Sequence, residues 1–483
     1  MKKAISIIII FVFTLCNYTA FADGGEIYQT VEPVEYAETC VDQSINLFGN
    51  ERTLEQTLVE GWSSLQGIID VAAYNISAND IDDIYRSAVY NNPQLYYVSN
   101  GFGYSYNPLT QVVSYVAPIY TETDVDVITA TMDDISAATE EILMYVDESM
   151  TDFEKVMTVH DYMVLHYEYD NTLSNHSITI MTTKTGVCMS YAFAFKHLMN
   201  KLGIECLYVA SSEEMNHGWN LVKLDGSWYH IDLTWDDLGE EYGQISHKYA
   251  LLSDHEIQNL ENPHHGYDLK SLSADSDKYD KEHWHEGHGS VVTINKIYYY
   301  VDGNNLVDQS GKIIYSNLDG GDGSWSIGGW YYFPNDNYTG VAEHNGILYF
   351  NTDKAIYSYN PNTEKLSRLL SYDGICGMTI DRNTLEYYKL DMETNRFTSA
   401  GKYNLGKIRF GGTFHEGGKI TKRIYKEDDA DKICVYAHCT DCVKSQEIQK
   451  SGISTISFDA KDCQTLFYWD SNLKPLIPKE VYK

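Results

Sequence analysis

Apolar positions recur every three to four residues in several segments of the first half of the chain. The segment from Thr53 to Tyr74 has this spacing, and the segment from Ser77 to Pro93 begins with an N-cap residue and stops at a proline. Both predict helices. Between them and a further amphipathic helix predicted from Asp124 to Val146, β-branched and tyrosine residues alternate around Gly and Asn-Pro turns, as is typical of strands. Residues 23–145 are therefore expected to form a small α+β region.

The pattern over residues 146–262 predicts a second α+β domain. Thr151 and Glu154 have the spacing of a capping box, which predicts that a helix begins there. Another helix is expected from Cys188 to Leu202. The segments "ECLYVAS", "HGWNLVKL" and "SWYHIDLTW" then read as strands, and the Asp-Gly pair at 225–226 predicts a hairpin turn between the last two.

The chain becomes polar over residues 263–290 and then strongly β-like. The polar stretch contains five histidines and is expected to be a linker, because no acidic or cysteine ligand stands at a fixed spacing that favours metal binding; these histidines are His264, His265, His283, His285 and His288. Residues 291–406 contain three similar strand-turn-strand units, which predict propeller-like blades or an open β array. Residues 407–483 predict a small C-terminal β-sandwich. The expected fold is thus multidomain.

The N-terminal residues 1–22 combine two lysines, an apolar run and a small-residue cleavage pattern, which together predict a secretory signal peptide. No later run approaches the roughly 20 apolar residues needed to cross a bilayer. The formal net charge of −34 argues against nucleic acid and anionic membranes as partners. We expect a secreted, extracellular protein; the pattern does not define its oligomeric state.

Cysteines outside the signal peptide are few for a chain of this length and crowd toward the C-terminus. Cys434, Cys439, Cys442 and Cys463 are compatible with disulfides, free thiols or a zinc site, and export favours the disulfides. Cys206 lies in an apolar strand pattern, where a buried structural thiol is expected. No cofactor and no metal are predicted.

One cysteine, one histidine and one aspartate follow each other in the second domain. Cys188 is expected in the first turn of a helix, where backbone N–H groups favour a thiolate. His217 begins a strand and can take the thiol proton, and Asp232 lies on the next strand of the hairpin, where it can orient the imidazole. The alternative is that Cys188 is an ordinary buried helix residue.

Five neighbouring residues are expected to support this group. Trp219 and Trp235 can exclude water from the histidine and the aspartate, and Asn220 can brace the strands. Gly186 permits a tight turn into the helix. Tyr191 is a candidate for the second oxyanion donor, as are Tyr167 and Tyr169, the first donor being the backbone N–H of Cys188.

The motifs "GVCMSYA", "NHGWN" and "WYHIDLTWDD" resemble those of the transglutaminase-like superfamily of papain-like cysteine enzymes, in the same order. The resemblance covers roughly residues 151–262 and implies that Cys188 is the nucleophile, His217 the base and Asp232 its orienting partner. The sequence departs from the commoner motif at Met189 and Ser190, which leaves the size of the substrate open.

The function expected from this resemblance is hydrolysis of amide bonds in peptide or cell-envelope material through a thioester. Transfer of the acyl group from a protein glutamine to an amine uses the same three residues and remains an alternative. An adhesion or scaffold protein with an inactive domain is the third, because fold and activity are separate properties.

Overall fold

The computed structural model describes residues 26–33, 48–49, 52–172, 177–211, 215–239, 243–319, 338–391, 393–394, 396–439, 443–461 and 463–482. The predicted signal peptide and Cys40 lie outside the described residues. The chain divides into two compact units, one of residues 1–34 and 42–123 and one of residues 35–41 and 124–483. Among the described helices, none is long and apolar enough to span a membrane.

In its described residues, the first unit contains a four-stranded antiparallel sheet of strand order β1-β5-β6-β4, a two-stranded sheet β2-β3 and two α-helices. Its elements are β1 (Ile27–Val31), β2 (Phe48–Gly49), β3 (Arg52–Thr53), α1 (Leu54–Ser63), β4 (Ile69–Asp70), a 3-10 turn (Ala72–Tyr74), α2 (Ile81–Asn91), β5 (Val98–Tyr106) and β6 (Val113–Tyr120). Buried aromatic rings fill the core: Tyr85 of α2 stacks on Phe102 of β5 at 3.9 Å, and Trp62 of α1 meets Tyr85 edge-on.

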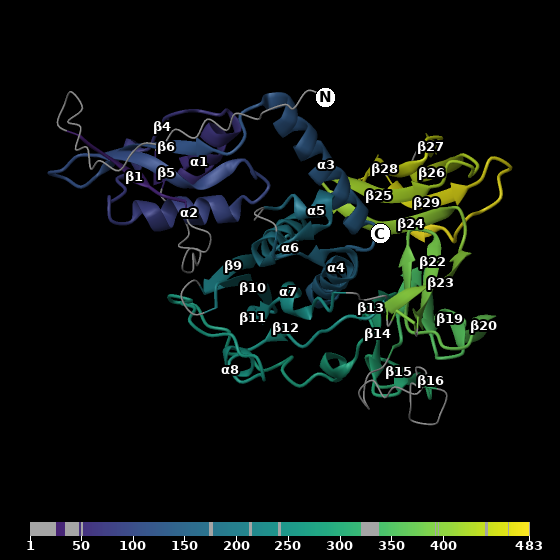
Figure 1. Ribbon diagram of the computed structural model, residues 1–483. Coiled ribbons are helices and arrows are strands. Elements are labelled where there is room, and N and C mark those ends of the chain that lie inside the picture. The colour runs from purple at the N-terminus through teal and green to yellow at the C-terminus, as the bar shows by residue number, and fades with distance from the viewer. Residues whose placement is uncertain are drawn as a thin grey trace, which may run out of the picture. The chain divides into compact units, whose positions relative to one another are not determined.

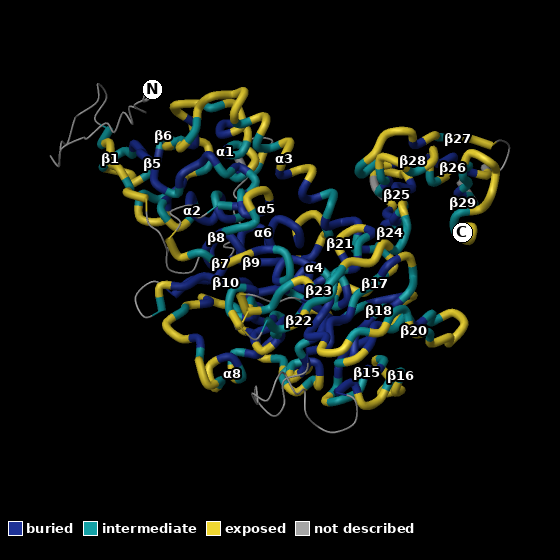
Figure 2. Tube along the Cα trace, turned by 45° about the vertical axis from the view of Figure 1, so that its right-hand side comes forward, coloured by how far each residue is buried: buried dark blue, intermediate teal, exposed yellow. Residues whose placement is uncertain are grey.

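The second unit begins with helices and a small antiparallel sheet, and α4 and α6 lie next to each other on one side of this sheet (Figure 1). The elements are α3 (Val125–Leu143), α4 (Asp152–His166), β7 (Glu168–Tyr169), α5 (Ile180–Thr183), β8 (Thr185–Gly186), α6 (Cys188–Leu202), β9 (Cys206–Ser211), β10 (His217–Leu224), β11 (Ser227–Ile231), α7 (Leu233–Asp236), β12 (Ala250–Leu252), α8 (Asp254–Ile257) and a 3-10 turn (His283–Glu286). The strand order is β12-β11-β10-β9. Helix α6 packs on β9 and β10, and these three elements are buried almost throughout (Figure 2).

Three open antiparallel sheets follow in the chain. They consist of β13 (Val292–Ile294), β14 (Ile297–Asp302), β15 (Asn305–Asp308) and β16 (Ile313–Ser316); of β17 (Val341–His344), β18 (Ile347–Asn351), β19 (Ala355–Asn360) and β20 (Lys365–Ser371); and of β21 (Met378–Asp381), β22 (Thr384–Asp391) and β23 (Arg396–Asn404). The first strands β13, β17 and β21 lie side by side. The predicted β-repeats are therefore separate sheets, and within the described residues they do not form a closed propeller.

The last sheets share one hydrophobic core. Their strands are β24 (Ile408–Glu416), β25 (Lys419–Lys426), β26 (Ile433–Cys439), β27 (Val443–Ile448), β28 (Gly452–Asp459), β29 (Cys463–Trp469) and β30 (Glu480–Val481). The sheet β24-β25-β28 contributes Ile420 and Ile424, and the sheet β27-β26-β29-β30 contributes Val435 and Leu466, all buried against one another. The two sheets thus form a two-layer β module, and the multidomain organisation expected from the sequence is present in this coarse form.

Helix α3 differs from the sequence expectation, because it belongs to the second unit and not to an N-terminal region ending at 145. Its last turns are held by cations from distant strands. The Arg423 guanidinium donates to Glu140 at 2.6 Å, and Arg382 donates to Glu141 at 2.7 Å. The Arg423 side chain is 4% exposed, whereas that of Glu140 is 35% exposed, so the cation of this pair is buried and the carboxylate is partly in contact with water.

Residues 263–290 also differ from expectation, because they are packed against the domain that contains the sheet β12-β11-β10-β9 and do not form a solvated linker. Asp280 accepts hydrogen bonds from the backbone and hydroxyl of Ser253, and the Tyr229 hydroxyl bonds Ser276 at 2.6 Å. Trp284 is buried to 1% exposure. The polar composition of this segment reflects hydrogen bonding to the domain surface, which the sequence pattern could not distinguish from solvation.

Candidate active site

Cys188 is the first residue of helix α6 and is 2% exposed. The preceding Val187 caps the helix without a side-chain hydrogen bond, and its carbonyl accepts from the N–H groups of Ser190 and Tyr191. The thiol therefore lies at the positive end of a 15-residue helix, where negative charge is favoured. Gly186 lies two residues before Cys188 and is closely packed. A Cβ at this position would stand 2.8 Å from side-chain atoms of both Ile180 and Ser190, which explains the glycine.

His217 and Asp232 meet across the sheet as the sequence pattern anticipated. His217 is the first residue of β10, and Asp232 follows β11, which pairs with β10 in an antiparallel register. The Nε2 of His217 lies 2.6 Å from Oδ2 of Asp232. Both are buried, at 6% and 1% exposure. The structure thus brings the histidine and the aspartate together, and a hydrogen bond links His217 to Cys188 on its other side.

The charges at this group reinforce one another. Burial alone lowers the pKa of His217, but the charge and hydrogen bond of Asp232, together with Cys188, outweigh it and raise that pKa to about 10. Burial opposes ionisation of Asp232, yet His217 and a second histidine hold its pKa well below the usual range for a carboxyl. The arrangement therefore favours an imidazolium paired with a carboxylate, beside a thiol at a helix N-terminus.

Two tryptophans enclose the pair, as expected from the sequence. Trp219 stacks on His217 with centroids 5.7 Å apart, and Trp235 lies 5.2 Å from the same ring. The Trp219 indole donates to His230 at 2.9 Å, which fixes the orientation of its ring. His230 in turn bonds Asp254 at 2.8 Å. These contacts shield the ion pair from water, which strengthens it.

Asn220 and Tyr191 tie the helix that carries the thiol to its neighbours. The Asn220 amide donates to the carbonyls of Ala192 in α6 and Leu207 in β9, at 3.1 and 3.2 Å. The Tyr191 hydroxyl donates to Asp237 at 2.5 Å, just after α7. This hydrogen bond makes Tyr191 a brace between α6 and the segment that follows α7.

The other two candidate tyrosines differ in their access to the thiol. Tyr167 is buried at 2% exposure. Tyr169 is 42% exposed and pairs in the backbone register with Gly186, two residues before Cys188. Burial raises the pKa of Tyr169, and the nearby charges of Cys188 and Asp232 raise it further. The contribution of Cys188 to this shift indicates that the Tyr169 hydroxyl interacts electrostatically with the thiol.

The structure adds a residue that sequence reasoning assigned to the linker. His264 is completely buried, and its Nε2 lies 2.8 Å from the same Oδ2 of Asp232 that His217 contacts. It reaches the site from the segment after α8, 32 positions beyond the aspartate. No spacing rule links it to the motifs, so the only available signal was the crowding of histidines in 263–290.

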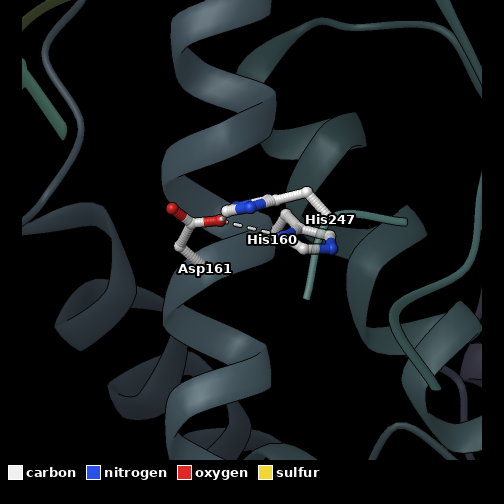
Figure 3. Close-up of side chains that lie close together, drawn as sticks. All are labelled: His160, Asp161 and His247. Carbon is white, nitrogen blue, oxygen red and sulfur yellow. Dashed lines mark hydrogen bonds and ion pairs between the residues drawn. The ribbon is translucent and has the colours of Figure 1, made fainter. Parts of the chain in front are cut away.

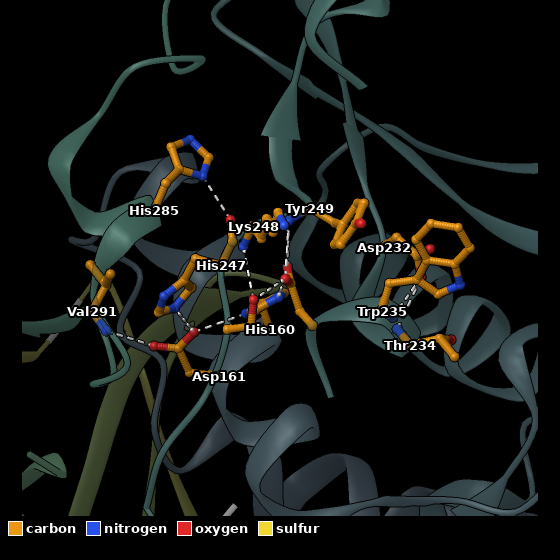
Figure 4. A network of polar contacts seen from close by, with 12 residues as sticks. His160, Asp161, Asp232, Thr234, Trp235, His247, Lys248, Tyr249, His285 and Val291 are labelled. Atoms are coloured by element: carbon orange, nitrogen blue, oxygen red, sulfur yellow. Dashed lines mark hydrogen bonds and ion pairs between the residues drawn. The ribbon is translucent and has the colours of Figure 1, made fainter. Parts of the chain in front are cut away.

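A second buried cluster of the same residue types lies beside the first, on helix α4 and the loop before β12 (Figures 3 and 4). His160 places Nδ1 2.9 Å from Asp161 and Nε2 3.2 Å from Asp236, the last residue of α7. The Nε2 of His247 lies 2.8 Å from the same Asp161 oxygen, and the other oxygen accepts the backbone N–H of Val291. The cluster therefore joins α4, α7 and the start of the β-sheets.

Both clusters offer three ligand atoms within 4.8 Å of one another, a separation that a metal ion can bridge. The hydrogen bonds favour ion pairs instead. Both ring nitrogens of His160 face carboxylates, and although burial lowers its pKa, Asp161 and Asp236 raise it to about 9. A protonated imidazole has no lone pair for a metal.

The remaining cysteines for which the structure describes side chains are unpaired. Cys206, Cys376 and Cys434 are buried free thiols, and burial raises the pKa of Cys206 to about 12. Cys434 therefore departs from the predicted disulfides, because its Sγ faces Glu447 at 3.8 Å and not another sulfur. The side chains of Cys439, Cys442 and Cys463 lie outside the described residues.

A cavity of about 520 Å³ lies in the second unit, away from Cys188, His217 and Asp232. It is lined by α4, by the first strands β13, β17, β21 and β24, and by residues 477–480. Its lining mixes acidic, basic and apolar side chains and includes none of Cys188, His217 and Asp232.

Comparison with known proteins matches residues 141–233 to the family model of the transglutaminase-like superfamily. Kyphoscoliosis peptidase from Homo sapiens is 25% identical over 140 residues, and the Mus musculus protein of that name is 24% identical over the same length. The alignments cover 22% of this chain and 21% of each relative, so the chain spans about a fifth of their length. A crystal structure of a TGase overlaps 39% of this chain and 49% of its own, at 15% identity and a TM-score of 0.20.

Proposed function

Because residues 141–233 belong to the transglutaminase-like superfamily, we propose that this protein is a cysteine enzyme that hydrolyses amide bonds through a thioester at Cys188. The observation that carries the proposal is the buried chain of contacts from Cys188 to His217 to Asp232. The three groups stand in the order that nucleophilic catalysis needs, with a base next to the nucleophile and an anion on the far side of the base.

In the first half-reaction, the Cys188 thiolate attacks the amide carbonyl and the carbonyl oxygen becomes negative. The backbone N–H of Cys188 is a donor to that oxygen, and the Tyr169 hydroxyl is the side-chain candidate for a second. When the C–N bond breaks, the His217 imidazolium gives its proton to the departing amine. A thioester and a neutral imidazole remain.

In the second half-reaction, water attacks the thioester. Neutral His217 takes a proton from the water, the C–S bond breaks, and the thiolate is restored beside the imidazolium. Asp232 stays ionised throughout, because it stabilises the imidazolium without accepting the proton. The products are a carboxylate and an amine, and no cofactor takes part.

Peptide or protein substrates fit this chemistry, and we propose peptide or cell-envelope amides outside the cell. The predicted signal peptide supports export, and the two curated relatives are named peptidases. The net charge of −34 favours neutral or cationic substrate segments over acidic ones.

The test incubates the full chain with a library of internally quenched peptides, some containing glutamine, with and without a fluorescent primary amine. Wild type, Cys188→Ala and Cys206→Ala are compared. Cys206 is the matched control, because it is a buried thiol whose pKa burial raises to about 12. Peptide cleavage, or ammonia release in the absence of the added amine, that is lost only in Cys188→Ala supports hydrolysis.

Amine incorporation that depends on Cys188 and exceeds hydrolysis would replace the proposal with acyl transfer. Equal activity in Cys188→Ala would overturn the cysteine mechanism. Iodoacetamide labelling of Cys188 in wild type, compared at pH 6 and pH 8, reports on the thiol without any substrate. Slow labelling that rises only toward high pH would indicate an ordinary thiol and favour the scaffold alternative.

A further inference from the structure

We propose that His264 is a positioning residue of the active site, which fixes Asp232 by donating its Nε2–H to the carboxylate oxygen that also holds His217. This inference rests on the proposed function, since it assigns a role within the same site. It extends the group of three residues by a fourth that the family motifs at 186–192, 216–220 and 228–237 do not contain.

The contacts of His264 are those of a residue built into the site. Its ring is fully buried and lies 4.7 Å from Trp219 and 4.3 Å from Trp235, the two rings that enclose His217. Its backbone N–H donates to the carbonyl of Ile257 at 3.0 Å, which anchors the segment on helix α8. Within the described part of the chain, the side chain makes one hydrogen bond, to Asp232.

The two histidines on Asp232 have different protonation patterns. The Nδ1 of His264 is buried and has no hydrogen-bond partner among the residues that the structure describes. A doubly protonated ring would leave a buried N–H unpaired, which is costly, so His264 is the neutral tautomer that carries its proton on Nε2. His217 has Cys188 on its far side and is therefore the histidine that takes the charge.

All lone-pair directions of Asp232 are then in use. Oδ1 accepts the backbone N–H groups of Thr234 and Trp235 at 3.0 and 3.3 Å, and Oδ2 accepts from His217 and His264. The first pair holds the carboxylate at the start of α7, and His264 prevents Oδ2 from turning away from His217. The consequence is an imidazole held in the orientation that faces Cys188.

The experiment compares full-length wild type, His264→Phe, His264→Gln and His265→Gln. Phenylalanine keeps the ring packing and removes the donor, whereas glutamine keeps a donor at the position of Nε2. His265 is the exposed neighbour and serves as the control. The readouts are the pH profile of iodoacetamide labelling of Cys188, kcat and KM on the best peptide, and the melting temperature.

We expect labelling at pH 6 and kcat to fall about tenfold in His264→Phe, since a hydrogen bond to a charged group has about this weight. KM stays unchanged because His264 does not touch the substrate. His264→Gln recovers most of the rate, and His265→Gln matches wild type. A His264→Phe protein with the wild-type pH profile and kcat, whatever its melting temperature, would overturn the proposal.

A measurement on wild type covers the case in which His264→Phe does not fold. Isotope-labelled histidine in the full chain reports the protonation of each ring nitrogen by NMR. His264 is expected to be neutral with its proton on Nε2; a cationic ring, or a proton on Nδ1, would overturn the assignment. If wild-type Cys188 itself labels as an ordinary thiol, the proposed function fails, whereas fast wild-type labelling with unaffected His264 variants defeats only the present inference.

Discussion

Two buried clusters of this protein each contain two histidines on one aspartate, yet their surroundings differ. In the first, Asp232 lies between His217 and His264, and His217 also contacts a cysteine at a helix N-terminus. In the second, Asp161 lies between His160 and His247, and its remaining oxygen accepts a backbone N–H.

The comparison teaches that residue types do not by themselves make an active site. The second cluster holds His160 between two carboxylates, one facing each of its ring nitrogens, and they keep this imidazole charged. The first leaves one side of His217 for a nucleophile. We infer that the first cluster governs reactivity, whereas the second fixes α4 against α7, and the predictions below separate these roles.

The largest expected effect is the loss of turnover in His217→Ala. Removal of the base leaves Cys188 without its proton acceptor, and the rate should fall by about 10⁴-fold or more. Turnover is measured with saturating peptide, and urea unfolding reports the fold. Global unfolding of this variant would show that His217 is a core residue. Both clusters would then have a structural role, and the first would no longer differ from the second.

Asp232→Asn should lower turnover by about 10²–10⁴-fold, because an amide no longer stabilises the imidazolium or selects its tautomer. Some thiol reactivity should remain. The matched change in the second cluster is Asp161→Asn, which should reduce stability more than rate. Both are followed by kcat and by urea unfolding, and an unaffected rate in Asp232→Asn would remove this residue from the mechanism.

His160→Ala should lower the free energy of unfolding by about 3–5 kcal/mol, because the buried carboxylates of Asp161 and Asp236 would lose the cation that pairs with them. The exposed His255→Ala is the control. Turnover per folded molecule should change far less than in His217→Ala, as measured below the melting temperature of the variant. A drop in rate equal to that of His217→Ala would make the second cluster catalytic.

Stability should decrease as the pH rises from about 6.5 to 9. The folded-state pKa of His160 is raised from its ordinary 6.5 to about 9, so the folded protein binds this proton more tightly than the unfolded chain does. The resulting stabilisation is complete below about pH 6.5 and is lost as the pH passes 9. His217 acts with the same sign, up to about 10.

Urea unfolding at several pH values measures this window in wild type and in His160→Ala. The variant should show a flatter dependence between pH 6.5 and 9, because only His217 then contributes. An identical slope in both proteins would mean that His160 is not the titrating group and that its two carboxylates do not hold it as a cation.

The smallest expected effect is that of a chelator, which should leave turnover unchanged. Both clusters are satisfied by protons in place of metal ions, as the raised pKa values of His217 and His160 indicate. Activity is measured before and after dialysis against EDTA, with metal content checked by mass spectrometry. Inhibition by EDTA that added zinc reverses would show that one of the clusters binds a metal ion. The interpretation of both clusters as protonated ion pairs would then be wrong.

Local rules predicted much of the site. The capping box at Thr151 and Glu154 is present at the start of α4, and α6 begins at Cys188 as expected. The hairpin turn adopts positive φ at Asp225 and Gly226, which sets the register that carries Asp232 to His217. Each of these features depends on neighbours within a few residues or on one hairpin.

The sequence by itself determined the order of Cys188, His217 and Asp232 and the elements that carry them, because helix starts, strand alternation and tight turns are decided locally. Only the tertiary structure decided that His264 completes the hydrogen bonding of Asp232, and that helix α3 is held by Arg423 and Arg382. These contacts join residues between 32 and 283 positions apart, and the chain pattern carries no periodicity that selects such partners. Burial selects them, because a charged or polar group inside the protein is stable only where a partner is present.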